Sequence, residues 1–336
     1  MGARFVEEDG MSHRRRPTIA DRTIDGILGD FPELRDIDHV IDAAGEEAFG
    51  MCGELMRLTE DMYNGKADDD ALMRMDTAGM LRPDLVALWS RWRQCRHVYR
   101  FDKGLSEALS ETKSPEDMPT DALRRLPYPV SFVEARLPYG TVGCDTLWMR
   151  GFFVWAEDDA VVIVSVFDDR LASLSIFTDG KTLGEAVDKV VWADRMAWRN
   201  YGGLKSEEEQ RESVRSTFMP IIAHLLYIVS ENSEQEVVYR PSGRANPRKA
   251  SPSTIHEVGT RIGRRLGQAR VRYVGVGSDG SSGSSVRPHV RSAHWHHYWT
   301  GSMSEPESRR LVVRWLEPIF VNAGGRETET VVHEAS

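Results

Sequence analysis

The stretch VVIVSVFDDRLASLSIF, residues 161–177, indicates the kind of sheet that the fold contains. Residues 161–167 form a nearly continuous β-branched and apolar run, and residues 171–177 form a second strand-like run. Asp168-Asp169 stands between the two runs, and acidic residues in that position are typical of a tight turn. The pattern therefore predicts two antiparallel strands joined by a short connection.

The strand pattern continues upstream, and a helical pattern follows it. Residues 126–137 alternate apolar and polar side chains, and residues 145–156 form another strand-like run. Because the connections are short, we expect an antiparallel meander and not a series of β-α-β units. Residues 183–198 then predict a helix, and a second helix is expected from Ser206 to Val229, with a kink or break at Pro220.

The first third of the chain has helical periodicity. Apolar residues recur at steps of three and four between residues 37 and 100, and Pro83 is placed to open one of these helices. Trp92 and Trp148 are predicted to belong to the core. The fold class predicted is α+β: a helical N-terminal region, then an antiparallel β-meander with packed helices, then a basic β-rich C-terminal segment. The expected units are a mainly helical region (1–118), an α+β core (119–236), the basic segment (237–323) and a disordered tail (324–336).

Within the basic segment the pattern is mixed. Residues 255–266 predict a basic helix, and residues 270–276 predict a strand. Residues 311–315 and 319–321 predict two further strands, joined across Pro318.

Composition excludes several classes of protein. The 336 residues are 40% hydrophobic and 28% charged and include nine tryptophans, which is typical of a folded globular protein. No apolar run reaches the roughly 18 to 20 residues of a membrane span, so no membrane partner is expected. The three cysteines, Cys52, Cys95 and Cys144, form no disulfide framework, which predicts a cytoplasmic location. Either Met1 or Met11 is compatible with the true start.

The charge is unevenly distributed along the chain. The whole chain has 43 Lys+Arg and 52 Asp+Glu, but residues 237–323 contain 14 basic and 5 acidic side chains. This local charge of +9 indicates contact with a polyanion such as RNA. The alternative is that the basic segment pairs with the acidic remainder of its own chain.

The most distinctive stretch is RPHVRSAHWHHYWTG, residues 287–301. Arginines bind phosphate and aromatic rings stack on unpaired bases, so the mixture suggests a nucleic-acid contact. A structural role, with the tryptophans in the core, is the alternative. The candidate nucleic-acid-binding residues are Arg261, Arg264, Arg265, Arg287, Arg291, Trp295, Tyr298, Trp299 and Arg314.

The histidines in the same stretch raise the question of a metal site. Residues 281–303 contain no carboxylate or thiolate ligand, and neighbouring residues on a strand point to opposite faces. We therefore expect no bound metal and no cofactor. If a metal were present, its ligands would come from His289, His294, His296 and His297.

No sequence motif of a known catalytic site is present. The chain has no GxSxG motif and no phosphate-binding loop, and His224 lies among apolar residues as a core histidine would. Two alternatives to a binding protein stay open: a metal-dependent nuclease or other hydrolase that uses the His/Arg cluster, and a DNA-binding accessory factor of a mobile element.

The stretch at 287–301, followed by LVVRWLEPIFVN at 311–322, resembles the C-terminal signature of the type V-A anti-CRISPR family that blocks biogenesis of the type V effector nuclease. EVGTRIGRRL (257–266) and LPYP (126–129) fit the same family. The resemblance is best over about residues 125–322.

The resemblance implies a non-enzymatic protein of mobile-element origin. Such a protein would recognise the nascent chain of a defence effector and trigger loss of the effector's mRNA. The implied partners are that nascent polypeptide and RNA or the ribosome. The peptide-binding residues and the oligomeric state are left open by the sequence.

Overall fold

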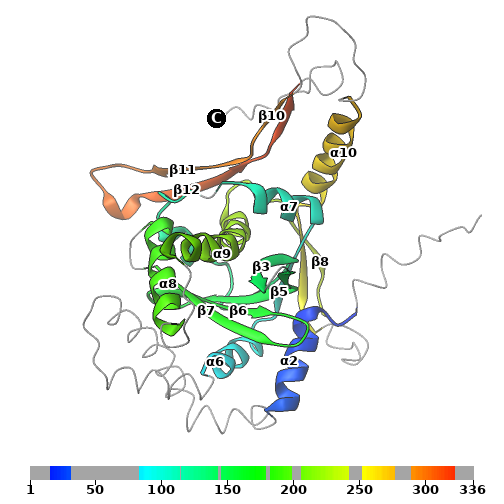
Figure 1. Cartoon of the computed structure of the whole chain (residues 1–336), viewed down its shortest axis with the longest axis vertical. Helices are drawn as coiled ribbons and strands as arrows, with labels where there is room; N and C mark the ends of the chain where they lie inside the picture. The colour runs from blue at the N-terminus through cyan, green and yellow to red at the C-terminus, as the bar shows by residue number, and fades with distance from the viewer. Residues whose placement is uncertain are drawn as a thin grey trace, which may run out of the picture.

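The protein is described by a computed structural model (Figure 1). Several sequence predictions lie outside the described residues: the helices expected within 37–82, the choice between Met1 and Met11, residue Arg287, and the tail after 324. The structure describes residues 16–31, 83–113, 115–142, 145–178, 182–198, 206–241, 252–276 and 289–321.

A seven-stranded mixed sheet forms the centre of the molecule, as Figure 1 shows. The meander predicted from residues 161–177 is confirmed, because β5, β6 and β7 pair antiparallel in sequence order. The sequence did not predict that β1 pairs parallel with both β2 and β9. In spatial order the strands are β7 (Leu171–Phe177), β6 (Ala160–Val166), β5 (Gly151–Ala156), β2 (Ser131–Glu134), β1 (His97–Phe101), β9 (Thr254–Val258) and β8 (Gln235–Tyr239).

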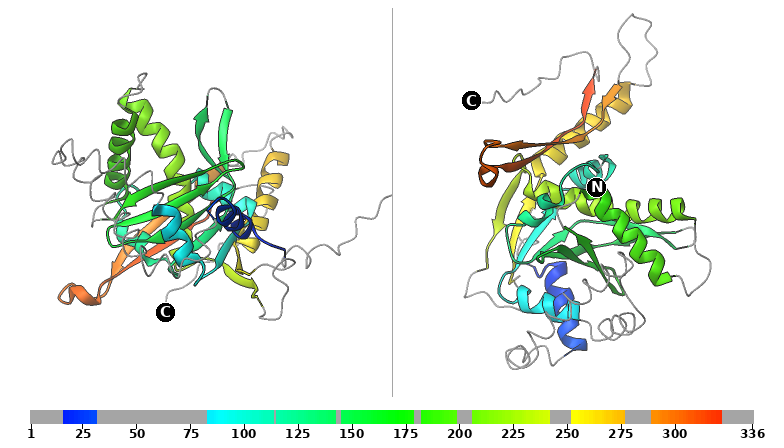
Figure 2. Two further views of the ribbon diagram at one scale, coloured as in Figure 1. Left: turned by 90° about the horizontal axis from the view of Figure 1, so that it is seen from below. Right: turned by 90° about the vertical axis from the view of Figure 1, so that its left-hand side faces the viewer.

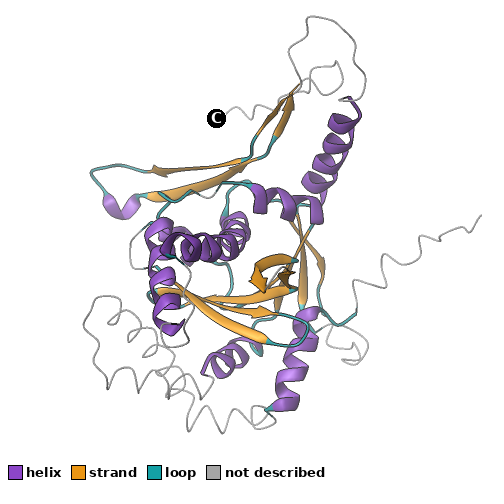
Figure 3. Ribbon diagram, in the orientation of Figure 1, coloured by secondary structure: helices purple, strands orange, loops and turns teal. Residues whose placement is uncertain are grey.

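Helices cover both faces of this sheet (Figures 2 and 3). On β5, Phe152 and Val154 belong to one buried apolar cluster, and Phe153 and Trp155 belong to the other. Burial on both faces explains why these strands are almost continuously apolar. One face is covered by α7 (Lys103–Glu111), η4 (Thr120–Arg125), α8 (Leu183–Trp198) and α9 (Glu207–Val229), and the other by α2 (Ile19–Asp30) and α6 (Pro83–Trp92).

Several element boundaries differ from the prediction. The prediction of helical structure up to residue 100 is wrong at its end. Helix α6 ends at Trp92, and residues 97–101 form strand β1. The single strand expected at 126–137 is two strands, β2 in the sheet and β3 (Leu137–Val142) in a separate hairpin with β4 (Asp145–Met149). Helix α9 begins at a Ser206–Glu209 capping box, as predicted, and continues as one helix through Pro220.

After β9, the described part of the C-terminal segment consists of one helix and two ribbons. The strand expected at 270–276 is wrong, because α10 runs from Thr260 to Val276. The helix expected from residue 255 is wrong at its start, since residues 254–258 form β9 and Gly259, at φ +71°, makes the turn into α10. The strands predicted at 311–315 and 319–321 are confirmed. The two ribbons pair β11 (His294–Thr300) with β12 (Arg310–Leu316), and β10 (His289–Arg291) with β13 (Ile319–Val321); η5 (Pro306–Ser308) lies between β11 and β12.

Candidate functional site

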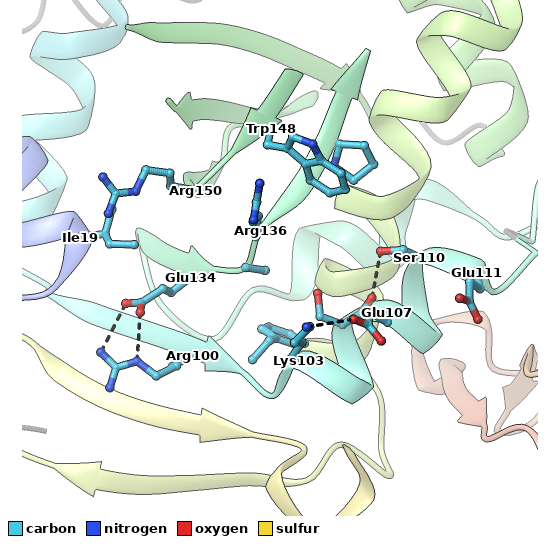
Figure 4. A pocket seen from close by; sticks show the side chains of 14 residues that line it. Ile19, Arg100, Lys103, Glu107, Ser110, Glu111, Glu134, Arg136, Trp148 and Arg150 are labelled. Atoms are coloured by element: carbon cyan, nitrogen blue, oxygen red, sulfur yellow. Dashed lines mark hydrogen bonds and ion pairs between the residues drawn. The ribbon is translucent and has the colours of Figure 1, made fainter. Parts of the chain in front are cut away.

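A pocket of about 870 Å³ opens where β1 and β2 end, between α7 and the β3–β4 hairpin (Figure 4). This volume lies in the range of roughly 300 to 1,000 Å³ that is typical of ligand-binding pockets. The carboxyl ends of parallel strands are a common place for such sites, because the chain turns away there into a helix or a loop. The charged and aromatic side chains that line it are Arg100, Phe101, Lys103, Glu107, Glu111, Glu134, Arg136, Trp148 and Arg150.

An ion pair forms the floor of the pocket. Arg100 on β1 and Glu134 on β2 are partners in the parallel register, and the Arg100 Nε donates to Glu134 Oε1 at 3.1 Å. Both side chains are partly buried. The pair is therefore held in place by the sheet and presents one fixed positive and one fixed negative group to a ligand.

The hairpin wall carries an exposed aromatic side chain. Trp148 on β4 is 43% exposed, and the Arg136 guanidinium lies 4.9 Å from the centroid of its ring. The prediction that Trp148 belongs to the core is therefore wrong, whereas Trp92 is buried as predicted. A two-stranded hairpin with one face on the protein leaves every second side chain to solvent, which accounts for the position of Trp148.

The helix wall is acidic. Glu107 and Glu111 are one turn apart on α7 and both line the pocket, and Glu107 also forms an ion pair with Lys103 at 3.8 Å. The Asp102 carboxylate accepts hydrogen bonds from the backbone N–H groups of Gly104 and Leu105, which fixes the start of α7. The pocket thus combines an exposed aromatic ring, two carboxylates on the helix and several positively charged side chains. Such a mixture is suited to binding a polar, extended ligand.

Metal chemistry finds no support in the described part of the chain. Among the described ranges, no three His, Cys, Asp or Glu side chains are close enough to hold an ion. His294 and His296 lie on the same exposed side of β11, and His297 is half-buried. His289 lies in β10, on the other ribbon.

The predicted nucleic-acid-binding residues are divided between two places. On the β11–β12 hairpin, Trp295 is buried in the core and Tyr298 is half-buried. Trp299 is 42% exposed, with the Arg309 guanidinium 5.3 Å from its ring centroid. Arg314 donates to Glu231 at 3.2 Å.

The remaining predicted arginines lie on and beside α10. Arg261 pairs with Glu234 and Arg265 pairs with Glu317, whereas Arg264 and Arg291 are exposed. Glu231 and Glu234 belong to the acidic part of the chain. Pairing within the chain therefore neutralises a share of the basic segment, and the structure brings the arginines of α10 together but not with Trp295.

Near the sheet, two histidines, His224 and His256, are buried and a third, His97, is half-buried. His224 is fully buried, as the sequence predicted; its Nε2 lies 2.8 Å from Ser106 Oγ and its Nδ1 lies 2.7 Å from the Pro220 carbonyl oxygen. Burial lowers the pKa of His224 to about 4. The sequence did not predict that His97 Nδ1 and His256 Nε2 lie 2.9 Å apart on adjacent strands.

That histidine pair is biased toward the neutral state. Burial, with added repulsion from His97 and Arg240, lowers the pKa of His256 to about 4. Burial and the charge of Arg240 also lower the pKa of His97. The Tyr128 ring stacks on His97, with 3.4 Å between the ring centroids, and the Tyr99 ring stacks on His256.

Comparisons with known proteins assign the fold and the family. A family model described as AcrVA2-like, anti-CRISPR type V subtype A2 family, matches residues 99–323. A solved structure described as the crystal structure of AcrVA2 aligns with a TM-score of 0.52 at 16% identity, over 91% of this chain and 100% of that chain. A search of curated proteins found no match. The pocket and the C-terminal segment thus lie in a fold shared with an anti-CRISPR protein.

The family model spans more than half of the chain. The chain belongs to the AcrVA2-like family of type V-A anti-CRISPR proteins, which confirms the resemblance drawn from residues 287–301 and 311–322. In the described part of the chain, no helix has the length and apolar character to cross a bilayer.

Proposed function

We propose that this anti-CRISPR family member suppresses production of a defence effector by recognising the effector's nascent chain, with loss of the effector's mRNA as the result. The observation that carries the proposal is the family match over residues 99–323, because this range contains most of β1 and all of α7, β2 and the β3–β4 hairpin. These are the elements that form the walls and floor of the pocket. The partner is a polypeptide that emerges from a translating ribosome in the cytoplasm.

The chemistry of the pocket is compatible with a short extended peptide. The exposed ring of Trp148 offers an apolar surface, and Glu107 and Glu111 offer acceptors for backbone or side-chain N–H groups. Arg150, on the opposite rim, pairs with Asp168 and can donate to peptide carbonyl groups. A peptide needs such alternating apolar and polar contacts, because its backbone groups lose water when it binds.

Co-expression with a target effector tests the proposal. We expect the amounts of effector protein and of its mRNA to fall together, because the nascent chain is recognised before synthesis is complete. Purified protein added to a preassembled effector complex should leave nuclease activity unchanged. Inhibition of the preassembled complex with normal mRNA levels would contradict the proposal and indicate direct binding to the mature effector.

A further inference from the structure

Helix α10 is a strongly basic element fixed to the edge of the molecule. Its sequence, TRIGRRLGQARVRYVGV, contains five arginines and no acidic residue, in a chain whose net charge is −9. In Figure 1 it extends away from the central sheet, beside β10. Concentrated positive charge on a helix that points away from the body is typical of a surface that meets a polyanion.

The start of α10 is anchored to the protein. The Glu234 carboxylate accepts hydrogen bonds from the backbone N–H groups of Arg261 at 2.9 Å and of Ile262 at 3.0 Å. Although partial burial opposes it, these bonds and the Arg261 guanidinium lower the pKa of Glu234, so the carboxylate stays ionised. Gly263 is buried against Asp102 at the start of α7. The arginines are therefore presented by a fixed helix.

Exposure distinguishes this helix from the β11–β12 hairpin. The Arg261 side chain is 86% exposed although it pairs with Glu234, and Arg264 and Arg265 are also exposed. On the hairpin, by contrast, Glu231 alone pairs with both Arg310 and Arg314. Both groups of arginines are thus partly neutralised, because Glu234 and Glu317 pair with Arg261 and Arg265 on α10. The α10 face differs in the 86% exposure of Arg261, against 66% for Arg310 and 47% for Arg314, and in a third exposed arginine, Arg264.

We infer that the exposed arginine face of α10, formed by Arg261, Arg264 and Arg265 with Arg291 on neighbouring β10, binds the phosphate backbone of RNA. Arginines three and four positions apart on a helix lie about 5 to 6 Å from each other, so Arg261, Arg264 and Arg265 can engage successive phosphates. Guanidinium groups bind phosphate oxygens in a bidentate manner, and phosphate contacts alone select no base sequence. The inference deepens the proposed function, because it gives the protein a contact with the message or the ribosome that is separate from the pocket.

The test is fluorescence anisotropy with the full chain and a 20-nucleotide oligo(U) RNA at several salt concentrations. We expect binding that weakens with salt, by about 0.7 in the log–log slope for each phosphate neutralised. A triple variant, Arg261→Gln, Arg264→Gln and Arg265→Gln, should lower the affinity at least about tenfold and reduce the slope by about 2. Circular dichroism and the thermal midpoint confirm that the variant is folded.

Two matched variants make the test specific. Arg22→Gln, Arg124→Gln and Arg170→Gln remove the same charge from exposed positions elsewhere and should leave the affinity within about twofold. Arg310→Gln with Arg314→Gln should also leave the affinity within about twofold, because both residues lie on β12 of the hairpin and not on α10.

Three results would overturn the inference: unchanged RNA affinity in the α10 variant, an equal loss in the Arg22/Arg124/Arg170 variant, or equally tight binding of a poly-glutamate peptide. The last result would indicate an acidic protein partner. The assay contains no nascent chain, so its failure leaves the proposed recognition of the nascent chain standing.

Discussion

The side chain of Asn232 pairs with the backbone of Trp315 in the way that a neighbouring strand would. Asn232 Nδ2 donates to the Trp315 carbonyl oxygen at 2.7 Å, and the Trp315 N–H donates to Asn232 Oδ1 at 3.1 Å. The Glu231 N–H adds a bond to the Val313 carbonyl oxygen at 3.0 Å. The turn after α9 thus covers this edge of β12 and holds the β11–β12 hairpin on the protein.

Replacing Asn232 by Ala should therefore loosen the hairpin. Two backbone groups of a buried residue would lose their partners, so we expect a loss of about 1 to 3 kcal/mol in the free energy of unfolding. Urea denaturation measures the loss, and hydrogen exchange should show faster exchange at residues 311–315. Asn232→Asp keeps the acceptor for the Trp315 N–H but sets a carboxylate oxygen against the Trp315 carbonyl oxygen, so it should also be destabilising. Equal stability of all three proteins would contradict this account.

Gly263 and Gly267 on α10 provide a matched pair of substitutions. A Cβ at Gly263 would lie 1.7 Å from Asp102 Oδ1, whereas a Cβ at Gly267 has nothing within 4 Å. Gly263→Ala should destabilise the protein by at least about 1 to 3 kcal/mol, because α7 and α10 have to move apart. Gly267→Ala should be neutral or stabilise by up to about 1 kcal/mol, since alanine favours helix. Thermal unfolding measures the stability of both variants. Equal stability changes in Gly263→Ala and Gly267→Ala would mean that α7 and α10 are not packed as described.

Stability should fall in mildly acidic solution. His224 and His256 have pKa values of about 4 in the folded protein and about 6.5 when unfolded, so the unfolded chain binds protons first as the pH falls. Their contribution is complete above pH 6.5 and is lost between pH 6.5 and 4, at up to about 1.4 kcal/mol per pH unit for each histidine. Urea denaturation between pH 7.5 and 5 measures this slope.

The variant His224→Gln isolates one of the two groups. Glutamine can keep a hydrogen bond to Ser106 and does not titrate, so the slope between pH 6.5 and 5 should fall by about a third to a half, because His256 and His97 still contribute. An unaltered slope in the variant would show that His224 takes up its proton at the same pH in both states.

Trp148 and Trp299 allow the role of the pocket to be tested with a control of equal exposure. Trp148 lines the pocket at 43% exposure, and Trp299 lies on the hairpin at 42% exposure. Trp148→Ala should reduce suppression of the target effector at least about tenfold, since contact with an aromatic anchor is worth about 2 kcal/mol or more. Trp299→Ala should suppress as the parent does. Equal activity of both variants would exclude the pocket as the peptide site.

The sequence predicted the parts of the fold that depend on neighbouring residues. The β5–β6–β7 meander follows from short turns between apolar runs, and the start of α9 follows from the Ser206–Glu209 capping box. The parallel pairing of β1 with β9 joins residues more than 150 positions apart and has no local signal. Residues 270–276 contain β-branched residues typical of a strand, but they continue a helix that Glu234 and Gly263 have already fixed.

The pocket was less predictable than the fold, because its residues come together only through contacts between distant parts of the chain. The pocket combines side chains from β1, α7, β2 and the β3–β4 hairpin, and no single stretch of sequence marks it. Trp148 was expected in the core, because nothing in residues 145–149 shows that β4 pairs with β3 outside the central sheet. The arginines of α10 were identified from charge alone, and the structure added which of them share a face.

The central claim is that the peptide sequence of the target's nascent chain is what the protein reads. The most direct measurement is the mRNA level of a reporter that carries the target effector's first codons, with and without this protein. Synonymous recoding of those codons should preserve the loss of mRNA, and changing the encoded amino acids should abolish it. Loss of the effect on synonymous recoding alone would contradict the account, because it would show that the RNA sequence is read instead of the peptide.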